Sequence, residues 1–140
     1  INEAIENLEF VIQEKKAIVK VDSLPKVRGS RLLLLSLFQN LISNGVKFQQ
    51  LNKQIKVDIR AIKSGSECQI IVEDNGLGFD MKYLDKIMRP FGRYHDKKKF
   101  PGTGVGLAIC KKIVEAHGST LEVKSEEDKG TKFSFQLKDI

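Results

Sequence analysis

One amphipathic stretch, from Ser30 to Phe48, constrains the fold more than any other part of the chain. Its apolar residues recur at helical spacing and predict one stripe that faces a core, namely Leu34, Leu37, Leu41 and Phe48. Asn40, Asn44 and Lys47 are separated by four and three residues, so they share one helix face beside that stripe. Ser30 is the expected N-cap of the helix.

The polar face of this helix suits a magnesium-bound polyphosphate. Magnesium takes oxygen ligands and keeps several waters, and a neutral amide oxygen can join its shell without repelling the phosphates. Lys47 can hold a phosphate as a point charge. Taken alone, the same residues fit an ordinary solvated helix face equally well.

Composition bounds the class of protein. The 140 residues, 41% hydrophobic and 30% charged, predict one ordinary globular domain over residues 1–140. No stretch has the length and apolarity of a membrane span or a signal peptide. Because the chain begins with Ile1 rather than Met, we expect a piece of a longer protein. Cys68 and Cys110 lack metal or redox spacing, so we interpret them as core residues in a reducing, cytoplasmic compartment.

The net charge of +6, with a lysine run at 97–99, fits nucleic acid, an acidic surface or a phosphate ligand. No nucleic-acid-binding pattern accompanies the charge. We therefore expect a local phosphate site and no nucleic-acid partner.

The hydrophobic pattern predicts an α+β fold of two layers, with helices on one face of a mixed, mostly antiparallel sheet. Expected helices span residues 1–15, 30–48, 83–88 and 104–117, and expected strands span 17–22, 54–62, 67–73, 121–125 and 132–137. The strands at 54–62 and 67–73 form a hairpin with a four-residue connection. The last helix presents Val105, Ile109, Ile113 and Val114 to the core, and Gly118 is its C′ residue.

A short polar motif, Asp74-Asn75-Gly76-Leu77-Gly78-Phe79, follows the strand at 67–73. Its two glycines allow a sharp turn and a close backbone approach to a ligand. An ionised Asp74 only accepts hydrogen bonds, so it can take the exocyclic amino group of adenine and would face the carbonyl oxygen of guanine. An ordinary turn at the end of a strand is the alternative.

A glycine-rich motif, Gly102-Thr103-Gly104-Val105-Gly106-Leu107, leads into the last helix. Backbone N–H groups at a helix start form a natural phosphate site. The glycine spacing differs from the dinucleotide fingerprint, and the Lys-Ser/Thr of a Walker A loop is missing. The common nucleotide folds are therefore disfavoured, while a phosphate role is retained.

In this order, the motifs at 40–48, 74–79, 90–93 and 102–107 resemble the N, G1, F and G2 boxes of sensor histidine kinases. The resemblance covers nearly the whole chain and is strongest to phytochrome-like and hybrid kinases. It implies the catalytic ATP-binding domain, with the Bergerat fold of the GHKL superfamily that DNA gyrase, Hsp90 and MutL share.

The resemblance also implies roles for single residues. It implies that Asn44 ligates Mg²⁺ through the ATP phosphates, that Lys47 binds phosphate, and that Asp74 binds the adenine amino group. Asn40, Lys47 and Arg93 are the implied catalytic residues, and residues 80–103 are the implied ATP lid. The full implied nucleotide site is Asn44, Lys47, Phe48, Asp74, Gly76, Gly78, Phe79, Gly102, Thr103, Gly104, Val105, Gly106, Leu107 and Thr131.

Gly76 and Gly78 are expected to open room for the base, and Thr131 to hold adenine through water. Gly45 stands where the N box usually has alanine, which should loosen the helix by less than about 1 kcal/mol. His95 and His117 lack the surroundings of a phosphoacceptor.

The implied function is transfer of the ATP γ-phosphoryl group to a histidine on a separate dimerisation and phosphoacceptor domain. The implied partners are those helices and a downstream response-regulator receiver domain, within a homodimeric parent that is either soluble or membrane-anchored. The isolated chain is then expected to be nearly inactive. The alternatives are a stand-alone GHKL-type ATPase and a nucleotide-sensing module. In the ATPase relatives a glutamate stands at the position of Asn40, and asparagine cannot replace it as a base.

Overall fold

The computed structural model describes residues 1–50, 52–91 and 106–138. Its described part contains a five-stranded sheet in the order β1-β2-β3-β5-β4. The strands are β1 (Ile18–Val21), β2 (Lys56–Ser64), β3 (Glu67–Asp74), β4 (Glu122–Glu126) and β5 (Gly130–Lys138). β1 runs parallel to β2, and the other neighbouring pairs are antiparallel, which confirms the mixed, mostly antiparallel sheet.

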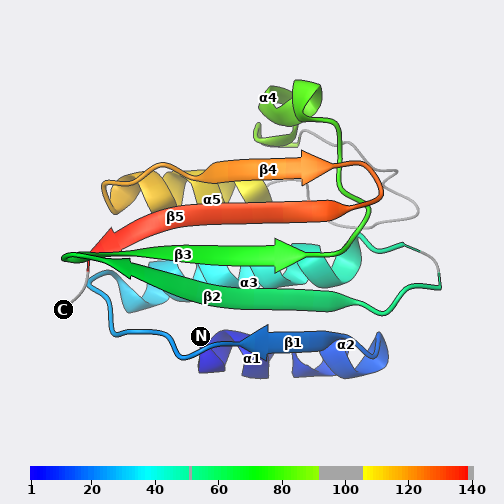
Figure 1. Ribbon diagram of the computed structural model, residues 1–140, viewed down its shortest axis with the longest axis horizontal. Helices are drawn as coiled ribbons and strands as arrows, with labels where there is room; N and C mark the ends of the chain where they lie inside the picture. The colour runs from blue at the N-terminus through cyan, green and yellow to red at the C-terminus, as the bar shows by residue number, and fades with distance from the viewer. Residues whose placement is uncertain (51, 92–105, 139–140) are drawn as a thin grey trace.

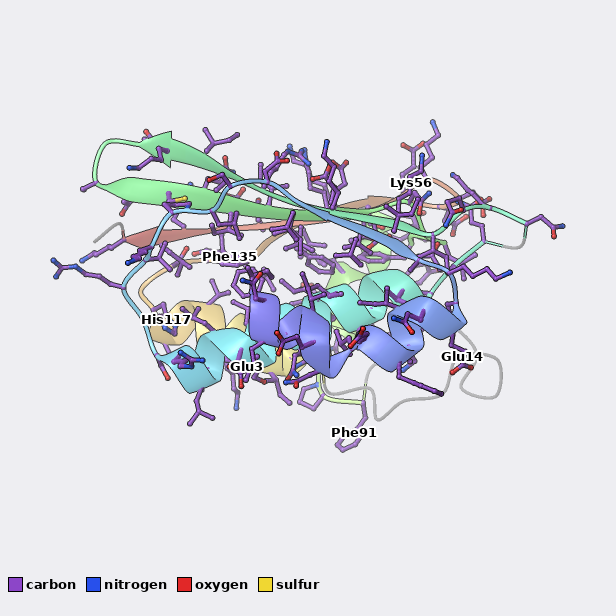
Figure 2. All side chains as sticks on the ribbon, turned by 90° about the horizontal axis from the view of Figure 1, so that it is seen from below. Glu3, Glu14, Lys56, Phe91, His117 and Phe135 are labelled. Carbon is purple, nitrogen blue, oxygen red and sulfur yellow. The ribbon has the colours of Figure 1, made fainter. Side chains whose placement is uncertain are left out.

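The helices are α1 (Asn2–Asn7), α2 (Glu9–Glu14), α3 (Arg31–Lys47), the 3₁₀ turn η1 (Met81–Tyr83), α4 (Leu84–Ile87) and α5 (Gly106–Ala116). Of these, α1, α2, α3 and α5 lie on one face of the sheet, as the sequence predicted, whereas α4 lies beyond its β4 edge (Figure 1). Figure 2 shows the two layers from the side. Phe135 on β5 points between the layers, and Lys56 lies on the outer side of the sheet.

The centre of the helical layer is α3, whose register was predicted correctly. Leu37 and Leu41 are fully buried, while Leu34 and Phe48 are partly buried. The Ser30 hydroxyl accepts a hydrogen bond from the Leu33 N–H at 3.3 Å, which confirms the N-cap. The alternation of apolar and polar residues in β2 and β3 supplies the opposite wall of the core.

The first 15 residues form two short helices, so the prediction of one continuous helix was wrong. The break is at Leu8, which has φ −104° and ψ 5° and whose N–H bonds three residues back to Ile5. The two helices still bury one apolar face, because Ala4 is buried and its apolar neighbours pack against the core. A local tightening of the backbone thus interrupts the helix without changing the face that it buries.

The hairpin between β2 and β3 has a shorter loop than predicted. Ser64 pairs with Glu67, so the connection is the two residues Gly65-Ser66 and not four. Gly65 has φ +61°, a conformation that two-residue hairpin loops require and that glycine adopts without strain. The strand pairing therefore continues up to the loop.

The described part of the last predicted helix is α5, but one of its predicted core residues was wrong. Ile109 is 40% exposed, whereas Ala108, Cys110, Ile113 and Val114 are buried. Cys110 lies against α3, with its sulfur 3.9 Å from the Leu37 carbonyl, and the neighbouring Ile109 lies on a different side of α5. Burial raises the pKa of the Cys110 thiol to about 12, and Cys68 is also buried, which confirms that both are core residues.

Other boundaries shift slightly. β4 begins one residue later than predicted and β5 two residues earlier, and the short helix at 83–88 is η1 followed by α4. Gly118 has φ +76°, which confirms it as the C′ residue of α5. Within the described ranges, no helix has the length and apolarity that crossing a bilayer requires.

His117 joins the end of α5 to the beginning of α3 (Figure 2). Its Nε2 accepts a hydrogen bond from the Ser30 N–H at 3.1 Å, and its Nδ1–H donates to the Ile113 carbonyl, with 2.8 Å between nitrogen and oxygen. Both ring nitrogens are therefore engaged in holding two helix ends together.

We expect His117→Ala to lower the free energy of unfolding by about 1–2 kcal/mol, because the Ser30 N–H and the Ile113 carbonyl lose a shared partner. Urea denaturation of the variant and the parent chain measures the loss. Glu115→Ala, an exposed change on the same helix, is the control. Equal midpoints for the two variants would contradict the bridging role.

Candidate functional site

The candidate site lies where α3 crosses the ends of β2 and β3. Asp74 is the last residue of β3 and pairs with Val57 on β2 and Thr131 on β5. Gly45 on α3 packs directly against this point. A Cβ added to Gly45 would lie 2.8 Å from Val57 Cγ2 and 3.2 Å from Asp74 Cβ. The helix and the strand end are therefore in close contact, without a side chain between them.

The other end of the site is the contact between α3 and the first residue of α5. The Asn40 side-chain nitrogen donates to the Ser36 carbonyl at 2.8 Å, which fixes the orientation of the amide. A Cβ added to Gly106 would lie 2.8 Å from Asn40 Oδ1. The structure thus brings the predicted N-box residue Asn40 to the predicted phosphate-binding residue Gly106.

Asn44 lies one turn further along α3 and differs from Asn40 in its bonding. Its side-chain amide forms no hydrogen bond within the part of the chain that the structure describes. The side chain is partly buried. An amide oxygen in this position can serve as a ligand to a hard cation without breaking a bond to another described residue.

The Asp74 carboxyl is electrostatically unusual. Desolvation by burial raises its pKa from 3.8 to about 7, and neighbouring Glu73 adds to the rise. Hydrogen bonds from the backbone of Gly76 and Thr131 act in the opposite direction. The prediction assumed an ionised carboxylate, whereas burial favours the protonated form of Asp74.

Thr131 is buried and belongs to a partly buried hydroxyl network beside Asp74. Its Oγ1 lies 2.8 Å from Ser125 Oγ, which also accepts from the Phe79 N–H at 2.9 Å and donates to the Gly130 carbonyl at 3.0 Å. Because the single Ser125 proton goes to Gly130, the Thr131 hydroxyl is the donor of their shared bond. Phe79 itself is buried in the core.

Gly76 and Gly78 allow backbone segments to approach each other. The position of a Cβ on Gly76 is filled by the Phe48 carbonyl oxygen, and that on Gly78 by the Glu126 carbonyl oxygen. Gly78 also has φ +62°, which a side chain would strain. The glycines are needed for packing on these sides, and their role in making room for a base stays a prediction.

The remaining described residues of the predicted site lie close to these. The Lys47 ammonium is 5.2 Å from the centroid of the Phe48 ring, at the end of α3. Leu107 is partly buried against the core, one residue into α5. Arg93, Gly102, Thr103, Gly104 and Val105 lie outside the described residues, as does the second half of the predicted lid, residues 92–103. Residues 1–50, 52–91 and 106–138 contain no cluster of three or more His, Cys, Asp or Glu that could hold a metal.

Sequence analysis missed two adjacent glutamines that follow the N-box helix. The Gln49 side-chain nitrogen donates to the Gly45 carbonyl, and its Oε1 is buried without a partner among the described residues. The Gln50 side-chain nitrogen lies within hydrogen-bonding distance of three backbone carbonyls. No periodicity marks these glutamines, because their partners include segments far away in sequence.

Comparison with known proteins gives a consistent result. The family model described as "Histidine kinase-, DNA gyrase B-, and HSP90-like ATPase" matches residues 29–139. Phytochrome-like protein Cph1 of Synechocystis is 36% identical over 137 residues, and cyanobacterial phytochrome A of Nostoc is 38% identical over 137 residues. Each match covers 98% of this chain but only 18% of the relative.

Solved structures agree with the fold. The mycobacterial sensor histidine kinase MprB superposes with a TM-score of 0.81 at 25% identity, covering 99% of this chain and 93% of that one. Full-length ShkA in complex with AMPPNP superposes with a TM-score of 0.80 at 22% identity, covering 99% and 29%. The second likeness concerns the fold alone.

We expect Gly45→Ala to destabilise the chain, although alanine favours helices by about 1 kcal/mol over glycine. The new methyl group would overlap Val57, and overpacking typically costs about 1–3 kcal/mol. A double-mutant cycle with Val57→Ala should show favourable coupling. Ser43→Ala on the same helix is the control, and a net gain in stability for Gly45→Ala would contradict the close contact.

We expect the stability of the nucleotide-free chain to fall as pH rises from about 4 to about 7 on account of Asp74. Its folded pKa of about 7 lies above the ordinary 3.8, so in this window the native state holds a proton that the unfolded state releases. The residues that face Asp74 from the packed elements do not titrate; they are Gly45, Val57 and Thr131. Its charged neighbour is Glu73, on the same strand.

Asp74→Asn removes this titration. Its stability relative to the parent chain should therefore be greater at pH 8 than at pH 5, as measured by urea denaturation. Glu73→Gln, on the exposed neighbour, serves as the control. The same difference at both pH values would contradict a buried, proton-binding carboxyl.

Proposed function

The chain belongs to the family of histidine kinase-, DNA gyrase B- and HSP90-like ATPases, and from this premise we propose that it is the ATP-binding catalytic domain of a two-component sensor histidine kinase. In this proposal the domain binds Mg²⁺-ATP and presents the γ-phosphoryl group to a histidine on a separate phosphoacceptor domain. The chain spans less than a fifth of the length of the curated relatives above, so the activity and partners of the whole protein are part of the proposal.

One observation supports the proposal most directly: α3 contacts both ends of the candidate site. Gly45 packs on Asp74, where the adenine would bind, and Asn40 faces Gly106, where the phosphates would lie. Asn44 lies between these two points on the same helix. A nucleotide extended along α3 would therefore meet a hydrogen-bond acceptor at its base and amide groups at its phosphates.

At the base end, Asp74 would accept a hydrogen bond from the adenine amino group. The Gly76 N–H, 2.9 Å from Asp74 Oδ1, orients the carboxyl for this contact. Thr131 lies in register with Asp74 and its hydroxyl contacts Ser125, so in this proposal that hydroxyl would be held beside the base. Binding of adenine would favour the ionised carboxylate and displace its proton near neutral pH.

At the phosphate end, Asn44 would hold Mg²⁺ through its amide oxygen, and Lys47 would contact a phosphate. The amide oxygen of Asn44 is a neutral ligand, which fits a cation whose charge is largely balanced by phosphate, and Asn40 would lie beside it near the phosphates. Mg²⁺ would supply neutralisation of the charge that develops on the transferred group. Arg93 and Gly102–Val105, outside the described residues, are proposed to complete this end.

Asn40 favours phosphotransfer over hydrolysis of ATP, and His117 indicates that the acceptor histidine lies outside this chain. Asn40 is an amide whose nitrogen is bound to Ser36, so it cannot take a proton from water as a carboxylate base would. His117 uses both ring nitrogens to join α3 and α5, so it is unsuited to accept a phosphoryl group. The acceptor histidine would lie on dimerisation helices of a homodimeric, cytoplasmic kinase region, and a response-regulator receiver domain would take the phosphoryl group next.

The proposal predicts a phosphohistidine on the parent protein and none on this chain. Radiolabelled ATP should give the full-length parent an acid-labile, base-stable label outside residues 1–140, and Asn44→Ala should reduce it at least tenfold, consistent with loss of a metal ligand. The isolated chain should bind ATP without labelling itself. Rapid hydrolysis by the isolated chain, abolished by Asn40→Ala, would overturn the kinase proposal in favour of an ATPase.

A further inference from the structure

The Gln50 side chain connects three backbone carbonyls next to the candidate adenine site. Its Nε2 lies 3.3 Å from the Asn75 oxygen, 3.0 Å from the Gly76 oxygen and 2.8 Å from the Asp128 oxygen. An amide nitrogen carries two hydrogens, so three acceptors require one shared bond. The contacts join the residues after α3, the loop after β3 and the turn between β4 and β5.

Two consecutive peptide groups are fixed by these contacts. A peptide group is planar and trans, so its carbonyl and its N–H point in opposite directions. In the peptide group between Asn75 and Gly76, the Asn75 oxygen accepts a hydrogen bond from Gln50 Nε2. The Gly76 N–H of the same group donates to Asp74 Oδ1 at 2.9 Å. In the next peptide group, between Gly76 and Leu77, the Gly76 oxygen accepts from Gln50 Nε2. The Leu77 N–H donates to the Phe48 carbonyl, also at 2.9 Å.

The turn between β4 and β5 is held by the same side chain. Gln50 binds the Asp128 oxygen, while the Asp128 N–H donates to the Leu77 carbonyl at 2.7 Å. Loop and turn are therefore bonded to each other and to Gln50. A rotation of the peptide between Asn75 and Gly76 would break the bond to Gln50 and the bond to Asp74 together.

We propose that Gln50 is a positioning residue for nucleotide recognition, which holds the Gly76 N–H against Asp74 and thereby aims the carboxyl at the purine amino group. This inference rests on the proposed function, because it takes Asp74 as the residue that reads the base. Gln50 acts through the peptide between Asn75 and Gly76 and does not itself contact the nucleotide.

The role predicts a specific effect on protonation as well as on affinity. The Gly76 N–H lowers the pKa of Asp74, against the larger opposing effect of burial. Without Gln50 that donor is free to turn away, so the pKa of Asp74 rises further and ionisation requires a higher pH. Glu73 is the charged neighbour on β3, and Gly45, Val57 and Thr131 face Asp74 from the packed elements, so the effect is assigned to the lost donor.

The test compares Gln50→Glu and Gln50→Met with Gln54→Glu in the chain as it exists. Gln50→Glu places acceptor oxygens against three carbonyls, and the neutral Gln50→Met removes the donor at similar size. Gln54 is a matched control, because its side-chain nitrogen also donates to a backbone carbonyl. The acceptor is Lys16, at 2.6 Å, which follows α2. Titration calorimetry measures ADP and GDP affinity between pH 5.5 and 8.5.

We expect both Gln50 variants to bind ADP about tenfold more weakly at pH 7, consistent with loss of a hydrogen bond to a charged group. Their preference for ADP over GDP should shrink, and the pH midpoint of ADP binding should move upward. Gln54→Glu should change none of these. Gln50→Met keeps the test decisive if Gln50→Glu fails to fold.

The outcomes separate this inference from the proposed function. If the parent chain binds no adenine nucleotide, or if Asp74→Ala binds ADP as tightly as the parent, the proposed function fails. If Asp74→Ala loses ADP while both Gln50 variants keep parental affinity, selectivity and pH midpoint, only the positioning role is overturned. A change in thermal stability alone, without change in these three quantities, would equally overturn it.

Discussion

The close packing of α3 on the ends of β2 and β3 determines where the candidate site lies. Gly45 carries no side chain, and the helix rests against Val57 and Asp74 at distances that a methyl group would violate. Because the residues of a regular helix have fixed relative positions, the contact at Gly45 also sets the positions of Asn40 and Asn44, which precede it on α3. The contact between Asn40 and Gly106 then fixes α5 relative to α3. The site is thus a consequence of how the two layers pack.

That packing conflicts with the chemistry expected of Asp74. A carboxyl that accepts a hydrogen bond from a base is most effective when ionised, yet desolvation by burial raises its pKa to about 7. The structure partly offsets this with backbone donors from Gly76 and Thr131, which stabilise the anion. Apolar surroundings strengthen a hydrogen bond between Asp74 and a base, but they also disfavour the ionised carboxylate. The positions of the Gly76 and Thr131 N–H groups therefore affect both the hydrogen bond and the ionisation.

The sequence allowed the fold and much of the site to be predicted, because these depend on local patterns. Helical spacing in α3 and alternation in β2 identify the two layers, and the glycine at 118 marks a helix end. The motifs around Asn40, Asp74 and Gly106 identified residues that the structure brings together. Two predictions failed because no local sequence pattern determines the outcome. The exposure of Ile109 depends on how α5, with Cys110, packs on α3. The helix break at Leu8 has no glycine or proline to mark it.

The part of the site that sequence could not reveal consists of bonds between side chains and distant backbone. Gln50 looks like one polar residue in a connection, and its role appears only when Asn75, Gly76 and Asp128 converge on it. Ser125 is similar, since one hydroxyl joins Phe79, Gly130 and Thr131. In both cases a single side chain forms hydrogen bonds to backbone groups from separate segments. The residues that would contact the ligand are therefore recognisable from motifs, whereas those that orient them are recognisable only from the fold.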